Sequence, residues 1–289
     1  MFTRFAPSPT GHLHLGHVVN AMYVWGIARA AGGRVLLRME DHDRIRCRPE
    51  YEAGILEDLE WLGFEPDEGL HPLLRQSDRD DVYREALDRL RQTHHVYACE
   101  CSRTHIAGER YDGFCRGRGL DDRPGRGLRV QIDDGVERFD DRFLGTLEQT
   151  PARQCGDLLL RDRDGHWTYQ FAVTVDDLAH GITDVIRGED LVASTGRQLR
   201  LRRMLGGVDA LRFAHHPLIL KPGGEKLSKS AADTGVRELR RAGVSAADVI
   251  GRAAAAVGLI DEPMPIAAHD VVEFFISSTL RCGSDRRPA

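Results

Sequence analysis

The sequence has little that points to a membrane or to secretion. No apolar stretch approaches the roughly 18 residues that a membrane-spanning helix requires. The longest apolar-looking segment, residues 253–260, is rich in alanine and contains Gly258. The first residues, MFTRFAPSPTGHLHLGH, lack the basic start and apolar run of a secretory signal. We therefore expect a cytoplasmic protein that has no membrane partner.

Excess positive charge is also lacking. The formal net charge is −5 and the sequence pI is about 6.2. These values argue against a protein that binds nucleic acid through overall basicity, so any RNA contact must come from local patches. No internal repeat or low-complexity segment is present, and nothing in the sequence implies an obligate protein partner.

Cysteine is scarce, with six residues in a chain of 289. Cys99, Cys101 and Cys115 fall within seventeen residues, whereas the other three are scattered. Without a secretory signal, this distribution indicates metal ligation rather than a disulfide framework. Thiolates suit the tetrahedral site of a structural Zn²⁺. His105 is the chemically conventional candidate for the fourth ligand.

The apolar pattern begins as strand–helix–strand–helix, which is typical of a parallel sheet covered by helices. The expected elements of this part are a strand at 3–6, a helix from Leu15 to the Gly32-Gly33 stop, a strand at 34–39 and helices at 48–62 and 78–92. Residues 99–127 are poor in aliphatic side chains, so this segment needs a metal ion or a similar cross-link to be stable. The later expected elements are antiparallel hairpins within 128–165, apolar segments at 171–175 and 184–187, a helix at 194–205, a short strand at 218–220 and helices from Ala232 onward.

The segment PSPTGHLHLGH, residues 7–17, lies between the first strand and the first helix. A helix N-terminus has unpaired N–H groups and therefore favours phosphate. Gly11 and Gly16 permit close approach to the backbone, and His14 and His17 are placed to stabilise charge at the α-phosphate during attack. The alternative is that these histidines only cap the helix or face solvent.

A second polar segment, KPGGEKLSKS, occupies residues 221–230. Its two glycines predict a flexible loop. Lys226 and Lys229 supply cations that suit a pyrophosphate leaving group, and Ser228 and Ser230 add hydroxyl donors. A solvated surface charge run is the alternative.

Together, HLGH and KLSKS resemble the two signature motifs of class I aminoacyl-tRNA synthetases. The segments RFAPSPTG, LRMEDHD, YQFAVTVDD and IRGEDL follow in family order and resemble the catalytic domain of glutamyl-tRNA synthetases. The resemblance covers residues 4–230. It implies an α/β fold with a Rossmann-type parallel sheet, a zinc-binding insertion and a short C-terminal helical stem. The implied boundaries are 1–95 and 166–235 for the two catalytic halves, 96–165 for the insertion and 236–289 for the stem.

The resemblance also implies roles for individual residues. Arginine pairs with carboxylates in a planar fork, which suits the two carboxylates of glutamate. The implied roles are catalysis by His14, His17, Lys226 and Lys229, glutamate binding by Arg4, Ala6, Ser8, Glu40, Tyr169 and Arg187, ATP binding (with Mg²⁺) by Gly16 and Lys229, and Tyr111 as the fourth ligand of one structural zinc. The structural alternatives are ion pairs of Arg187 with Glu189 and of Glu40 with Arg38 or Arg44.

Only residues 231–289 follow the second motif, which leaves no room for an anticodon domain of normal size. In this the sequence resembles a shortened branch of the family, which activates glutamate with ATP and esterifies it to queuosine in the anticodon of tRNA(Asp). The alternatives are a truncated synthetase that charges a tRNA 3′ end, a small-molecule adenylyltransferase and a non-catalytic tRNA-binding relative. The arginines expected to contact RNA, or to form a solvated loop face, are Arg103, Arg110, Arg116, Arg118 and Arg126.

Overall fold

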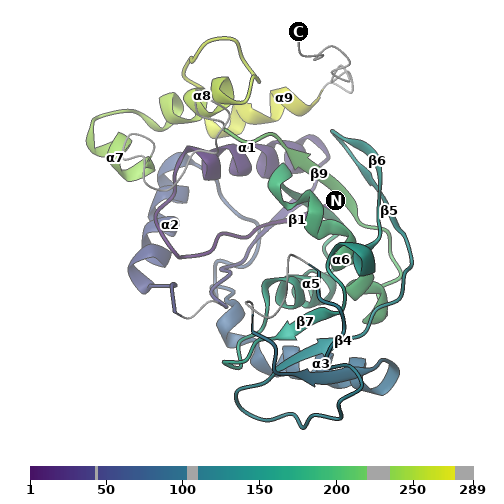
Figure 1. The fold of residues 1–289 in the computed structure, drawn as a ribbon. Coiled ribbons are helices and arrows are strands. Elements are labelled where there is room, and N and C mark those ends of the chain that lie inside the picture. Colours follow the sequence, from purple (N-terminus) through teal and green to yellow (C-terminus); the bar gives the residue numbers. More distant parts are fainter. Residues whose placement is uncertain (43–44, 103–109, 220–234, 277–289) are drawn as a thin grey trace.

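The computed structural model describes residues 1–42, 45–102, 110–219 and 235–276, and its centre is the parallel sheet that the sequence predicts (Figure 1). Strands β1 (Phe2–Phe5) and β2 (Arg34–Leu37) pair in parallel, with Thr3 opposite Val35. Strand β8 (Asp184–Gly188) lies beside β1, and the Thr183 N–H donates to the Phe2 carbonyl at 2.9 Å. Strand β9 (Arg212–His216) pairs in parallel with β8. The expected α/β fold is therefore confirmed.

Helix α1 (Leu15–Ala30) forms the centre of the core because almost its whole circumference is apolar and buried. It ends before Gly32, which has a φ of +60°. On its outer side lie α8 (Ala246–Ala256), a 3₁₀ turn at Ala268–Val272 and α9 (Glu273–Ile276) (Figure 1). Gly26 is required at one contact because a Cβ there would lie 2.4 Å from the ring of Phe275.

The two other predicted N-terminal helices are α2 (Pro49–Leu62) and α3 (Asp80–Thr93). Pro49 occupies the first turn of α2, where no intrahelical N–H bond is lost. Gly63, with a φ of +84°, ends that helix in the left-handed conformation. Both helices begin and end within two residues of the predicted limits.

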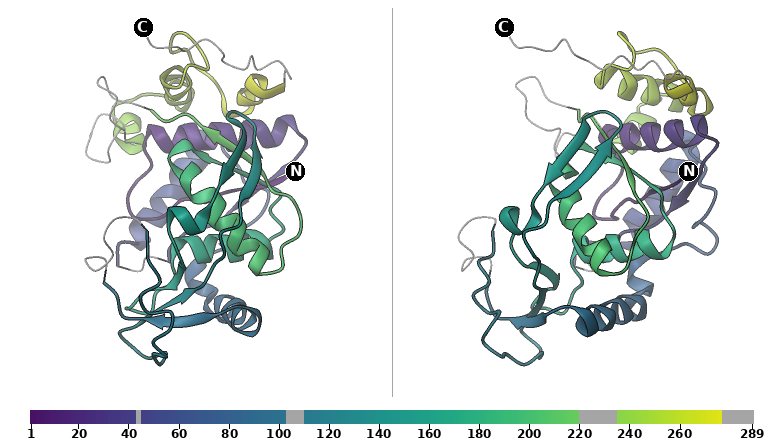
Figure 2. Two further views of the ribbon diagram at one scale, coloured as in Figure 1. Left: turned by 45° about the vertical axis from the view of Figure 1, so that its right-hand side comes forward. Right: turned by 90° about the vertical axis from the view of Figure 1, so that its right-hand side faces the viewer.

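A second layer is antiparallel and lies at the opposite end of the molecule from α8 and α9 (Figure 2). Strand β4 (Gly127–Val130) pairs with β3 (Val96–Cys99) and β7 (Leu158–Arg161). Helices α3 and α5 (Tyr169–Ala179) share a hydrophobic core with this sheet. The apolar segment at 171–175 thus belongs to a helix, and the one at 184–187 belongs to β8.

Strands β5 (Glu137–Asp141) and β6 (Gly145–Gln149) form the hairpin expected within 128–165. At Asp141, β5 also pairs in parallel with Phe213 of β9, so this hairpin extends the central sheet. The remaining helices are α4 (Pro151–Gln154), α6 (Val192–Met204) and α7 (Val236–Arg241), with 3₁₀ turns at Gln76–Asp78 and Glu189–Leu191.

The predicted strand at 218–220 is wrong. Leu218 and Ile219 have no regular structure, and residue 220 lies outside the described residues. The last strand ends at His216 because Pro217 has no N–H with which to continue the ladder. In the part of the chain that the structure describes, no helix is both long and apolar enough to cross a bilayer.

Candidate active site and thiol cluster

A cavity of about 580 Å³ lies at the carboxyl ends of β1 and β8. This edge is where parallel α/β sheets usually hold their ligands. The predicted site residues that line the cavity are Arg4, Ala6, His14, Gly16, His17, Glu40, Tyr169 and Arg187. Ser8 does not line it, and its hydroxyl lies 3.9 Å from the thiol of Cys47. The structure thus brings together eight residues that come from four separate sequence segments.

His14 and His17 form a reciprocal cap at the start of α1. The Nδ1 of His14 accepts from the Gly16 N–H at 3.1 Å, and the Nδ1 of His17 accepts from the His14 N–H at 3.1 Å. A neutral imidazole that accepts at Nδ1 carries its hydrogen on Nε2. Both rings therefore cap the helix, as the alternative proposed, and also line the cavity with protonated Nε2 atoms suited to phosphate oxygens.

The side chain of Arg4 is held by a buried carboxylate. Its Nε donates to both oxygens of Asp177, at 3.1 and 3.2 Å, and its Nη1 donates to the Ile186 carbonyl at 3.4 Å. Burial raises the pKa of Asp177, but Arg4 and Arg38 outweigh this effect and hold that pKa below its ordinary value. Three N–H groups of Arg4 have no acceptor among the described residues, enough for a bidentate carboxylate contact.

Glu40 forms the structural ion pair that was the alternative to its predicted role. The Nη2 of Arg38 donates to Glu40 Oε1 at 3.0 Å, while the Nη1 of Arg38 donates to Asp177 at 2.9 Å. Arg38 is completely buried, so the pair fixes Glu40 rigidly at the cavity wall. The two interpretations are compatible, because Glu40 lines the cavity while it is paired.

Arg187 contacts only neutral groups. Its four acceptors are His215 Nε2 at 3.1 Å, Gln198 Oε1 at 2.7 Å, Thr195 Oγ1 at 2.8 Å and the Leu191 carbonyl at 3.3 Å. No ion pair joins it to Glu189 or to another described residue, so the Arg187–Glu189 bridge that was the structural alternative is not formed. Burial lowers the pKa of Arg187. A buried guanidinium without a protein counterion favours an anionic ligand.

Several cavity residues were missed by sequence reasoning. Asn20 follows His17 by three positions and so lies on the same face of α1. His216, at the carboxyl end of β9, contacts the Asn20 amide at 3.1 Å and stacks on Tyr23. Burial lowers the pKa of His216 to about 4, which keeps the ring neutral. The helical spacing indicates Asn20, and a polar residue at a strand's carboxyl end indicates His216.

The predicted lysine residues, Lys226 and Lys229, lie outside the described residues. The described chain resumes at Gly235, which forms a β-bridge with His14. The Val236 N–H then donates to the Leu13 carbonyl at 2.9 Å. Gly235 and Val236, the first described residues after the lysines, therefore lie beside the histidine segment.

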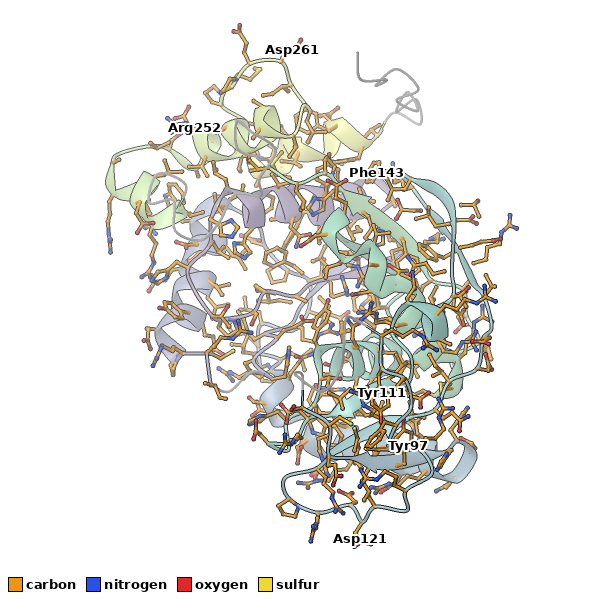
Figure 3. The ribbon with its side chains drawn as sticks, viewed as in Figure 1. Tyr97, Tyr111, Asp121, Phe143, Arg252 and Asp261 are labelled. Carbon is orange, nitrogen blue, oxygen red and sulfur yellow. The ribbon has the colours of Figure 1, made fainter. Side chains whose placement is uncertain are left out.

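The predicted thiol cluster is assembled in the antiparallel layer. The Sγ atoms of Cys99, Cys101 and Cys115 lie within 4.8 Å of one another, and Cys101 and Cys115 are 3.6 Å apart. The Tyr111 hydroxyl lies 3.6 Å from Cys99 Sγ and accepts from the Cys115 N–H at 2.8 Å. Tyr111 packs in this layer beside Tyr97 (Figure 3).

These residues fit a tetrahedral zinc ion. With Zn–S bonds of about 2.3 Å, two ligand sulfurs lie about 3.8 Å apart, close to the observed separation. Tyr111 is buried, and burial raises the pKa of its hydroxyl, whereas the hydrogen bond from the Cys115 N–H acts to lower that pKa. His105, the other predicted fourth ligand, lies outside the described residues.

The arginines near the thiol cluster have partners within the protein. Arg116 donates to both oxygens of Asp157, at 2.9 and 3.0 Å, and Arg118 pairs with Glu100. Arg110 and Arg126 donate to backbone carbonyls at 3.0 Å. The carboxylates of Asp157 and Glu100 reduce the net positive charge of the patch expected to bind RNA, and Arg103 lies outside the described residues.

Comparison with known proteins agrees with this geometry. The family described as tRNA synthetases class I (E and Q), catalytic domain, matches residues 1–126 and 116–246. A glutamyl-Q tRNA(Asp) synthetase from Nitratidesulfovibrio vulgaris is 41% identical over 302 aligned positions, which cover 96% of this chain and 92% of that protein. One from Dechloromonas aromatica is 44% identical, with 88% and 89% covered.

A solved glutamate tRNA ligase from Elizabethkingia meningosepticum, in complex with its amino acid, has a TM-score of 0.79 and 28% identity. The match covers 94% of this chain but 64% of that ligase, so this chain spans less than two thirds of the ligase's length. Mycobacterium tuberculosis methionyl-tRNA synthetase, at 13% identity and a TM-score of 0.57, shares the fold alone. The chain belongs to the class I tRNA synthetases of the glutamate and glutamine type and groups with the glutamyl-Q tRNA(Asp) synthetases.

Proposed function

We propose that this protein activates glutamate with ATP and transfers the glutamyl group to queuosine in the anticodon of tRNA(Asp). The observation that carries the proposal is the convergence of Arg4, Arg187, Glu40 and the two capping histidines on one cavity. Two cationic forks and one carboxylate complement the two carboxylates and the ammonium of glutamate. The curated relatives at 41% and 44% identity carry the same activity in their name.

In the first step, the α-carboxylate of glutamate attacks the α-phosphate of ATP, and pyrophosphate leaves. The start of α1 presents backbone N–H groups, and His14 and His17 present Nε2–H donors to the phosphate. These donors stabilise the charge that develops in the transition state. Lys226 and Lys229 would stabilise the departing pyrophosphate, with Mg²⁺ bound to ATP.

In the second step, a hydroxyl of the acceptor attacks the glutamyl carbonyl and AMP leaves. The cyclopentenediol of queuosine has two vicinal hydroxyls, as a terminal ribose does, so the same transfer chemistry applies. RNA bases in loops are splayed out and recognised one at a time. The acceptor would therefore be an unpaired base rather than a duplex.

We also propose that Cys99, Cys101, Cys115 and Tyr111 hold one structural zinc. Four protein ligands leave no position for a reactive water, so the ion would stabilise the antiparallel layer and take no part in the transfer. The ion would join the end of β3 to the loop before β4, which have few aliphatic residues of their own.

The decisive experiment offers labelled glutamate and ATP to tRNA(Asp) with and without queuosine. We expect label only on the modified RNA, and ribonuclease digestion should recover that label in the anticodon fragment. Label at the 3′ end of unmodified tRNA(Glu) would instead identify a truncated glutamyl-tRNA synthetase.

Glutamate-dependent exchange between ATP and pyrophosphate tests the first step separately. Its absence would favour a non-catalytic RNA-binding protein, and exchange that is driven by another acid would favour a different adenylyltransferase. Lys229→Ala should slow this exchange strongly and leave the KM for glutamate nearly unchanged, because Lys229 acts on charge that forms in the transition state. An unchanged exchange rate would remove this lysine from the mechanism.

A further inference from the structure

Behind the glutamate cavity lies a buried chain of hydrogen bonds that ends on Arg187. Asp141, at the end of β5, is 2.6 Å from the Nδ1 of His215 through Oδ2. The Nε2 of His215 accepts from the Nε of Arg187 at 3.1 Å. His215 is 1% exposed and Asp141 5% exposed, so solvent does not compete for these bonds.

We propose that Asp141 and His215 are positioning residues that fix the guanidinium of Arg187 for contact with the substrate amino acid. The inference rests on the proposed function, because it takes Arg187 as a glutamate-binding residue. Neither Asp141 nor His215 lines the glutamate cavity. Both must therefore act through Arg187.

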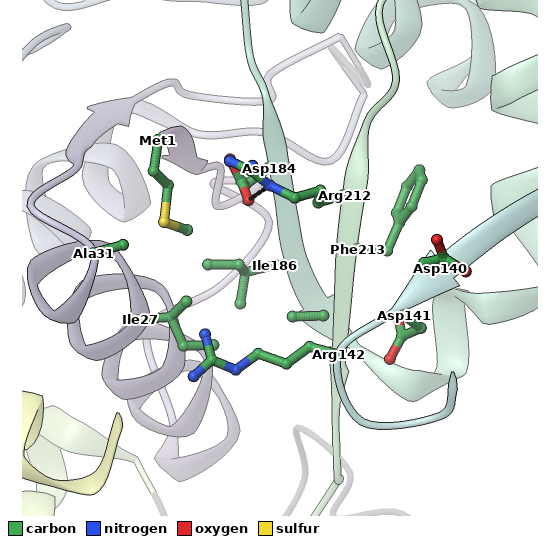
Figure 4. Close-up of a pocket in the computed structure, with 11 residues that line it drawn as sticks. Met1, Ile27, Ala31, Asp140, Asp141, Arg142, Asp184, Ile186, Arg212 and Phe213 are labelled. Atoms are coloured by element: carbon green, nitrogen blue, oxygen red, sulfur yellow. Dashed lines mark hydrogen bonds and ion pairs between the residues drawn. The ribbon is translucent and has the colours of Figure 1, made fainter. Parts of the chain in front are cut away.

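Asp141 lines a different cavity, together with residues of α1, β8 and β9 (Figure 4). That cavity lies at the amino ends of β8 and β9, where Asp184 and Arg212 are also found. Ile186 lines both cavities and so forms part of the wall between them. A substitution at Asp141 thus replaces no residue that would itself touch glutamate.

The hydrogen bonds define one protonation pattern. Asp141 Oδ1 accepts from the N–H groups of Phe143 and Leu144, at 3.0 and 3.1 Å. Oδ2 accepts from the backbone N–H of His215 and from its Nδ1. A neutral His215 therefore carries its hydrogen on Nδ1 and presents the Nε2 lone pair to Arg187.

The hydrogen bonds of Arg187 also determine how many of its N–H groups are available to a ligand. Its Nε donates to His215, one Nη1–H donates to Gln198, and Nη2 donates to Thr195 and Leu191. Of the five N–H groups of arginine, one on Nη1 is not used by these four acceptors, and the Tyr169 hydroxyl in the cavity wall also hydrogen-bonds to this guanidinium. Arg187 thus offers glutamate at most one N–H group beside Tyr169, whereas Arg4 has donors enough for a fork.

Replacing Asp141 by asparagine should reverse the tautomer of His215. Each oxygen of Asp141 faces two N–H groups, and the single oxygen of the new amide can replace only one of them; when it stays with Phe143 and Leu144, the NH₂ group faces the backbone N–H and the Nδ1 of His215. Nδ1 then becomes the acceptor, and the ring hydrogen moves to Nε2. The Nε2–H of His215 would then face the Thr195 hydroxyl, 3.2 Å away, and the Nε–H of Arg187 would lose its acceptor.

The test compares D141N with the matched control D140N. Asp140 is the preceding residue on β5, is exposed, and accepts only from the Thr146 hydroxyl among the bonds found in the structure. In glutamate-dependent ATP–pyrophosphate exchange, we expect the KM for glutamate to rise about 10–100-fold in D141N. The KM for ATP should stay within about twofold, and D140N should behave as wild type. A D141N protein with wild-type KM for glutamate, or with equal increases in both KM values, would overturn the proposal.

A second pair of variants decides the matter if D141N does not fold. H215Q keeps an acceptor oxygen that can reach Arg187, whereas H215F keeps the ring shape without an acceptor. We expect H215Q to recover most of the glutamate affinity that H215F loses. Equal KM values for glutamate in these two variants refute a role through Arg187. If wild-type protein and D140N show no glutamate-dependent exchange at all, the proposed function fails instead.

Discussion

Asp58 is expected to make the folded protein less stable as the pH rises, which is the opposite of the usual effect of a carboxylate. It lies on α2, its side chain is completely buried, and neither carboxylate oxygen has a hydrogen-bond partner among the described residues. The nearest cation is Arg237, whose Nε lies 4.0 Å away. Burial therefore outweighs Arg237 and raises the pKa of Asp58 from 3.8 to about 6.

The sign follows from proton binding. Between about pH 4 and pH 6 the folded protein binds more protons at Asp58 than the unfolded chain does, so stability falls as pH rises. A shift of about two units corresponds to at most about 3 kcal/mol. Between pH 4.5 and 7.5, the change in this contribution is about 2 kcal/mol.

The perturbation is Asp58→Asn, which removes this ionisation and keeps the shape of the side chain. The free energy of unfolding in urea, measured at several pH values, gives the difference between variant and wild type. That difference cancels the other titrating groups, and we expect the variant to gain about 2 kcal/mol relative to wild type from pH 4.5 to 7.5. Glu57→Gln is the matched control, because Glu57 is exposed and pairs with the same Arg237. Its difference from wild type should change little with pH. A flat difference for Asp58→Asn, or one that falls with pH, would refute the reasoning.

Three further outcomes are expected. Cys101→Ser should lower the zinc content from one ion per chain toward zero in metal analysis. The control is Cys155→Ser, which should retain the metal because the Cys155 thiol contacts the Pro151 carbonyl and lies outside the cluster. Wild-type protein without zinc would contradict the site. Arg4→Ala should raise the KM for glutamate at least tenfold and reduce discrimination against glutamine in the exchange assay, because it removes the guanidinium that binds the second carboxylate. If the wild-type protein activates glutamine or aspartate as well as glutamate, the pocket is misassigned. Gly16→Ala should slow exchange while the melting temperature changes little, because the new Cβ would lie 2.9 Å from the His14 ring that caps the helix; an unchanged rate would show that this ring position is unimportant.

Local features of the sequence account for much of the site. The His14–His17 spacing places both rings at the start of one helix, and α1 begins and ends where its apolar pattern and glycines predict. The close spacing of the cysteines likewise indicates a shared site, and the structure assembles it. Such features depend on neighbours a few positions apart, so propensity and spacing are enough to predict them.

The pairings that set the charge state of the site were decided only by the tertiary structure. Arg4 meets Asp177 across 173 positions, and Asp141 meets His215 across 74. Nothing in the sequence distinguishes Asp177 from Asp176, yet α5 turns Asp177 toward Arg4 and Asp176 toward Arg79 and Tyr83. The burial of Asp58 and the neutral surroundings of Arg187 could not be predicted from the sequence either. These properties depend on which strands and helices pack together and on how much water remains between them, and no local spacing along the chain records either one.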